Sequence, residues 1–104
     1  MPVRRVAKTP QADARGRRDD ELMAQLAAGR TSALAELYTQ HGRMVFAILG
    51  RYGGGVELAE LEELRQEVFL TLCDTASRYR GDGTLRSWLC GIAVRKARAY
   101  RAKQ

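Results

Sequence analysis

Apolar residues recur at three- and four-residue steps through most of this 104-residue chain. That spacing places apolar side chains on one face of an α-helix, whereas a half-buried strand would alternate apolar and polar residues. We find no such alternation, no internal repeat and no low-complexity tract. The sequence therefore predicts an all-α fold, a compact bundle of one short and three longer helices.

Glycines and helix-capping residues mark where each helix is expected to begin and end. The short helix is expected to begin at Asp19 and to end before Gly29, and the last helix to begin after the cap Thr84. The two helices between them are expected from Thr31 or Ser32 to the glycines 53–55, and from Glu57 to Ala76. Residues 1–18 contain both prolines and show no helical period, so we expect a disordered basic tail followed by one domain over residues 19–104.

Charge is divided unevenly along the chain, which has a net charge of +6. Residues 1–18 have six basic residues and one acidic, residues 19–77 have four basic and ten acidic, and residues 78–104 have eight basic and one acidic. A solvated surface usually mixes the two signs. The division predicts two partner surfaces, an acidic one on the third helix and a basic one on the fourth, and the basic excess favours a polyanionic partner.

Several classes of protein are disfavoured by what the sequence lacks. It has no apolar run long enough to insert into a membrane and no secretory signal, and the two cysteines, Cys73 and Cys90, are expected to stay reduced in the cytoplasm. The spacing of His41 and the cysteines forms no metal motif, and no phosphate-binding glycine loop is present, so no metal or cofactor is expected. No carboxylate or histidine is placed for catalysis, and we expect no enzyme activity.

The basic fourth helix and the loop before it have two interpretations. The arginines and lysines could form a solvated face near a helix C-terminus, or they could bind phosphates. Trp88 could pack in the core or, together with Tyr79 and Arg80, form a platform for unstacked bases. The acidic helix is similarly either a solubilising surface or a docking face for a basic partner.

Three patches of this sequence resemble region 2 of bacterial extracytoplasmic function sigma factors. They are the opening stretch 20–38, the stretch Glu63-Leu64-Arg65-Gln66-Glu67-Val68-Phe69-Leu70, and the stretch from Tyr79-Arg80-Gly81 through Leu85-Arg86-Ser87-Trp88-Leu89 to Ile92-Ala93. They occur in the family's order and at its spacing, from Asp20 to about Arg101. The resemblance implies a non-enzymatic transcription initiation domain with a compact helical fold.

By resemblance, the acidic helix binds core RNA polymerase at the clamp coiled coil of the β′ subunit. The residues that match the family's polar polymerase-binding positions are Glu63, Gln66 and Glu67, and Phe69 matches a further motif position for which packing alone is the alternative. The resemblance also implies that the loop captures unstacked non-template bases of the promoter −10 element, and that the last helix flanks that strand. The residues that match this DNA-binding segment are Arg80, Gly81, Asp82, Gly83, Thr84, Leu85, Arg86, Trp88, Arg95, Lys96 and Arg98.

Some positions depart from the family pattern. Cys73 and Cys90 replace common aromatic residues, Arg65 interrupts a usually apolar position, and Arg95 replaces a frequent asparagine, which leaves the preferred bases open. The family's second domain, region 4, which reads the −35 element, has no counterpart among these residues. An anti-sigma factor is an expected further partner. The alternative is a sigma-derived interaction module that sequesters an anti-sigma factor or polymerase, and a third interpretation is a nonspecific DNA binder.

Overall fold

The computed structural model describes residues 10–104, and its regular structure over that range is entirely helical. The elements in chain order are α1 (Pro10–Ala27), α2 (Ser32–Tyr52), α3 (Leu58–Thr75), the 3₁₀ turn η1 (Ala76–Arg78) and α4 (Leu85–Ala102). The predicted all-α bundle is therefore confirmed. Within the described range, no helix combines the length and the apolar character needed to cross a membrane.

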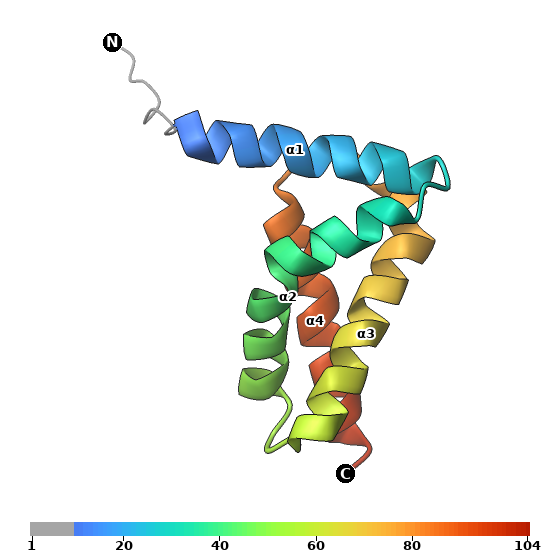
Figure 1. Ribbon diagram of the computed structural model, residues 1–104. Coiled ribbons are helices and arrows are strands. Elements are labelled where there is room, and N and C mark those ends of the chain that lie inside the picture. The colour runs from blue at the N-terminus through green and yellow to red at the C-terminus, as the bar shows by residue number, and fades with distance from the viewer. Residues whose placement is uncertain (1–9) are drawn as a thin grey trace.

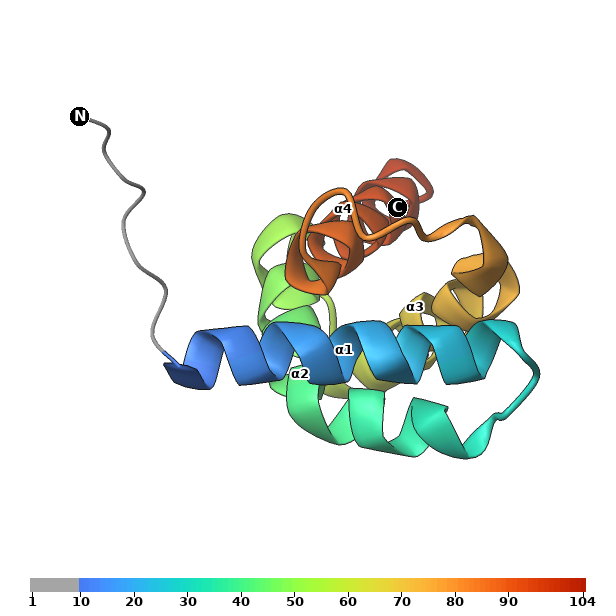
Figure 2. The ribbon, with the colours of Figure 1, turned by 90° about the horizontal axis from the view of Figure 1, so that it is seen from above.

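Helices α2, α3 and α4 pack beside one another, and α1 lies across one end of them (Figure 1). Seen from above, the first turns of α1 extend past the bundle (Figure 2). The core between the helices is built from the apolar residues that recur at three- and four-residue steps. Its largest fully buried side chains are Leu22 and Met23 of α1, Leu37, Val45 and Leu49 of α2, Val68, Phe69 and Leu72 of α3, and Leu85 and Leu89 of α4. The α1 residues close the end of the core nearest the loop before α4.

Helix α1 begins at Pro10, so the predicted start at Asp19 is wrong and the first helix is not short. Proline suits the first helical position, because the backbone N–H that it lacks would have no partner there. Arg18 anchors the added turns to α2, with its Nε and Nη2 donating to the two carboxylate oxygens of Glu36 at 2.8 and 2.7 Å. These bonds lower the pKa of Glu36. The predicted disorder of residues 1–9 lies outside the described residues.

Helix α2 changes direction about halfway along its length (Figure 1). Gly42 lies at this midpoint, and its carbonyl accepts a hydrogen bond from Arg65 Nη1 of α3 at 3.3 Å. The Arg65 guanidinium carbon also lies 5.0 Å from the ring centre of Tyr38 and 4.7 Å from that of Phe46. The arginine at a usually apolar position is thus accommodated between two aromatic rings and ties α3 to the middle of α2.

Two expectations about packing need correction. The three- and four-residue spacing places Tyr52 on the apolar stripe of α2, but at the end of that helix its side chain is exposed. Cysteine commonly behaves as a small buried residue, but Cys73 and Cys90 are only partly buried. Both are free thiols, and Cys90 Sγ lies 3.9 Å from Met44 Sδ.

Candidate nucleic-acid and protein interfaces

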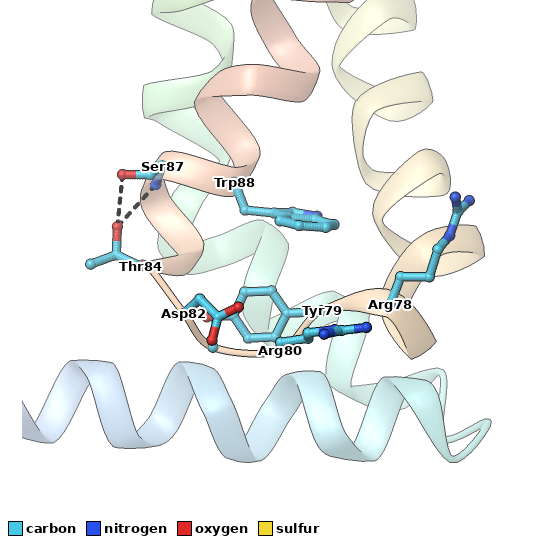
Figure 3. A pocket seen from close by; sticks show the side chains of 9 residues that line it. Arg78, Tyr79, Arg80, Asp82, Thr84, Ser87 and Trp88 are labelled. Carbon is cyan, nitrogen blue, oxygen red and sulfur yellow. Dashed lines mark hydrogen bonds between the residues drawn. The ribbon is translucent and has the colours of Figure 1, made fainter.

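The loop between η1 and α4 encloses one side of a cavity of about 560 Å³, and α4 forms the other side (Figure 3). We call it the loop pocket. Its lining residues are Arg78, Tyr79, Arg80, Gly81, Asp82, Gly83, Thr84, Ser87 and Trp88. Gly81 has a φ of +75°, in the left-handed region that glycine adopts without strain, which allows the chain to turn here. Thr84 then caps α4 by accepting a hydrogen bond from the Ser87 backbone N–H at 3.0 Å.

Two aromatic side chains fix the shape of the loop pocket. Tyr79 and Trp88 meet edge to face, with ring centres 5.6 Å apart. The Tyr79 hydroxyl donates to Asp20 of α1 at 3.2 Å, which joins the loop to a residue far away in sequence. Burial and the nearby Asp20 carboxylate raise the pKa of Tyr79 to about 12. Trp88 is half-buried against the core and also lines the pocket.

The structure brings most of the predicted DNA-binding residues of the loop together. Arg80 to Thr84 and Trp88 line the loop pocket, and Arg86, Arg95 and Arg98 are exposed along α4. Leu85 was expected to contact DNA, but it is 1% exposed and belongs to the core. Lys96 is half-buried, and its Nζ lies 3.9 Å from Glu67 of α3.

Arg78 and Ser87 also line the loop pocket and were not predicted. Ser87 could have been found from its position three residues after the cap Thr84, because the N-cap side chain bonds the N3 backbone N–H. Arg78 follows the end of α3 on the turn η1, and no sequence pattern pointed to it.

The acidic surface lies on α3. Glu63, Gln66 and Glu67 are all exposed there, as expected for a docking face. Phe69, in contrast, lies in the core: it is 2% exposed and packs against Tyr38, with ring centres 4.8 Å apart. It supports this surface from below.

An apolar groove that the sequence did not predict adjoins the acidic surface. It has a volume of about 210 Å³ and is lined by Leu34, Tyr38, Gln66, Phe69 and Leu70. Leu70 is 59% exposed, which is unusual for a leucine. Val68 and Phe69 already face the core, and Leu70, a further rotation of about 100° round the helix, falls off that face; the three consecutive apolar residues were the available signal.

The acidic helix α3 and the basic helix α4 contact each other directly. Besides the Lys96–Glu67 ion pair, the Tyr100 hydroxyl donates a hydrogen bond to Glu60, and this bond raises the pKa of Tyr100. The two charged surfaces therefore belong to one packed unit.

This fold and its surfaces can be compared with those of known proteins. The model of the family described as sigma-70 region 2 matches residues 37–104, which comprise most of α2 and all of α3 and α4. A search of curated proteins finds no match. Among solved structures, the chain is similar to an engineered region 2 of sigmaE determined by NMR in complex with GTAAAA. The identity is 23%, the TM-score is 0.73, and the match covers 83% of this chain and 87% of that one.

The structural match shows that the two chains share a fold, and the family match covers well over half of the present sequence. The resemblance to sigma factor region 2 is thereby confirmed. This chain belongs to the sigma-70 region 2 family of transcription initiation domains.

Proposed function

We propose that this domain binds core RNA polymerase through α3 and captures unstacked bases of the promoter −10 element in the loop pocket. The observation that carries the proposal is the pocket itself, a cavity of about 560 Å³ with an aromatic and arginine lining inside the segment matched by the family model. The similar solved structure, a complex with GTAAAA, supports a nucleic-acid ligand. Its identity of 23% carries no base preference over to this chain.

The lining of the loop pocket suits a base removed from its stack. Figure 3 shows the Trp88 indole on the α4 side of the pocket and the Arg80 guanidinium on the side of the loop. Aromatic and guanidinium planes both stack on bases, and each stacked base contributes about 1–3 kcal/mol. That is comparable to the few kcal/mol needed to unstack and unpair a base, so capture can offset local opening of the duplex.

The exposed face of α4 offers phosphate contacts beyond the pocket. Arg86, Arg95 and Arg98 project from it, and none has a hydrogen bond or ion pair to another described side chain. Unpaired arginines are ready to bind phosphates and to release counterions, so the affinity should fall with added salt. These contacts would position the strand, and the loop pocket would choose among its bases.

The polymerase surface in this proposal combines charge with an apolar contact. Glu63, Gln66 and Glu67 supply the polar groups, and the adjoining groove with Leu70 supplies apolar area. Interfaces commonly place an apolar centre inside a polar rim, and the groove offers such a centre. The partner expected on this surface is the basic face of the β′ clamp coiled coil.

The docking half is tested by binding to purified core polymerase. Replacing Glu63, Gln66 and Glu67 together by alanine should weaken binding strongly without changing the fold, because all three side chains are exposed. Leu70→Ala should weaken it further. Glu21→Ala, an exposed acid on α1, is the matched control. Unchanged polymerase affinity in the triple variant would refute the docking assignment.

A sequestration module is the second candidate, and the exposed apolar groove favours it. An anti-sigma factor covering α3 would use the same groove and acids without any promoter reading. The two candidates differ in one observable, since only the promoter-reading domain must prefer one single-stranded sequence over a scrambled one. Either role places the domain in the cytoplasm, where polymerase and promoter are found.

A further inference from the structure

A second cleft adjoins the loop pocket. It has a volume of about 410 Å³ and lies between the first half of α1, the middle of α2 and the first turn of α4. Arg15 of α1 and Arg86 of α4 line it, and Thr84 lines both this cleft and the loop pocket. An extended ligand that leaves the loop pocket past Thr84 therefore enters the second cleft directly.

The charges in the second cleft favour an anion. Arg15 and Arg86 are exposed, and neither makes a hydrogen bond or ion pair with another of the described side chains, those of residues 14–104. Asp19 is the acid of the cleft, and it is already engaged, since its Oδ1 lies 3.0 Å from His41 Nε2. Both of those side chains are nearly buried, at 14% and 13% exposure. Two guanidinium groups are therefore left to bind a ligand.

The nearby Arg18 does not have this freedom. It lies one turn along α1 from Arg15 and is held by Glu36 and Glu21, with donor–acceptor distances of 2.7 and 3.2 Å. The arginine that anchors α1 is thus neutralised, whereas Arg15 has no partner among the described side chains of residues 14–104. Arg15 also lies outside the residues 37–104 matched by the family model, so the family match gives it no role.

We propose that the second cleft binds the sugar-phosphate backbone of the same single strand whose bases enter the loop pocket. This inference rests on the proposed function and adds α1 to the path of the strand. Continuity at Thr84 favours a nucleic-acid strand over an acidic peptide, and apart from Gly16 the residues that line the cleft are polar or charged. Phosphates would lie between Arg15 and Arg86, which come from opposite ends of the sequence, and the strand would hold α1 against α4.

The test compares oligonucleotides of two lengths with the 104-residue chain. The short oligonucleotide is a single strand selected for binding and just long enough to fill the loop pocket. Each of two longer oligonucleotides adds three abasic nucleotides to it, one at the 5′ end and the other at the 3′ end. Abasic extensions carry phosphates and no bases, so any gain in affinity comes from the backbone. We expect a several-fold tighter dissociation constant for one of the two extensions, since the cleft lies to one side of the loop pocket.

Arg15→Ala should abolish this gain and leave binding of the short strand unchanged. It should also make the negative slope of log affinity against log salt concentration less steep by about 0.7, the value for one phosphate contact on a single strand. Arg17→Ala is the charge-matched control, because Arg17 is exposed on the same helix and does not line the cleft. It should retain the gain from the extension.

The outcomes separate this inference from the function on which it rests. If the short strand binds and neither extension adds affinity, or if Arg17→Ala removes the gain as fully as Arg15→Ala, the second cleft is not a backbone site. If the short strand fails to bind at all, the proposed base capture is wrong and this inference falls with it.

Discussion

Replacing Arg65 by methionine tests whether the buried guanidinium stabilises the fold. The Arg65 side chain is 17% exposed, lies between the rings of Tyr38 and Phe46, and donates to the Gly42 carbonyl and to Glu62 at 3.3 and 2.6 Å. A hydrogen bond from a charged group contributes about 1.5–3 kcal/mol, and each cation–π contact about 0.5–1 kcal/mol. Glu62 is half exposed, so that ion pair adds only about 0.3–0.5 kcal/mol.

Methionine fills a similar volume and keeps part of the aromatic contact through its sulfur, at about 0.3–1.5 kcal/mol. These contributions are not additive, and we expect a net loss of about 2 kcal/mol in the free energy of unfolding. For a domain of this size that is a fall of about 8–16 °C in the melting temperature.

Urea unfolding followed by circular dichroism gives the free energy of unfolding, and Arg43→Met on the exposed face of α2 is the control for charge removal. The Arg65 Nε has no hydrogen-bond partner among the described residues, which opposes this stabilisation. A methionine variant as stable as the parent would refute the reasoning. The free-energy cost of desolvating the guanidinium would then equal the stabilisation from all its contacts.

Three further predictions concern the loop and the helix ends. Thr84→Ala should lower stability by about 1 kcal/mol through loss of the cap on the Ser87 N–H, whereas Thr84→Ser should be nearly neutral in the same urea experiment. Tyr79 should ionise near pH 12 when absorbance is followed at high pH, and stability should fall between pH 10 and 12, because the unfolded tyrosine loses its proton first. Tyr79→Phe should reduce that fall, and an equally steep fall in this variant would contradict the assignment. Gly53→Ala should destabilise the α2–α3 connection, because the added methyl would overlap Val56 and lie 2.7 Å from the Leu49 backbone carbonyl oxygen, and an unchanged melting temperature would contradict this packing.

The sequence was informative about the end of α1 and about α2, α3 and α4, because these boundaries depend on local chemistry. Gly29 has the left-handed φ of +90° expected after a helix, and Thr84 makes the expected cap. The first half of α1 was missed because it has no apolar period. Its visible anchor is the Arg18–Glu36 pair, which joins residues on two different helices and leaves no pattern in a single window of sequence.

The part of the candidate site that forms one continuous stretch of sequence could be predicted. The loop from Arg80 to Thr84 forms the pocket as a single stretch, whereas the bond between Tyr79 and Asp20 depends on the tertiary fold. Phe69 and Leu85 were assigned to partner surfaces because they match motif positions, and a motif position does not say which way a side chain faces. Burial in the structure decides that question for both.

The central claim is that the loop pocket reads unstacked bases, and selection from a pool of randomised single strands tests it most directly. Fluorescence anisotropy at near-physiological salt would then compare the selected strand with a scrambled one, for the parent chain and for Arg80→Ala and Trp88→Ala, with circular dichroism confirming that each variant is folded. We predict tighter binding of the selected strand and loss of that preference in both variants. Weak, salt-sensitive binding that is indifferent to sequence and to both substitutions would contradict base reading and favour a docking or sequestration module.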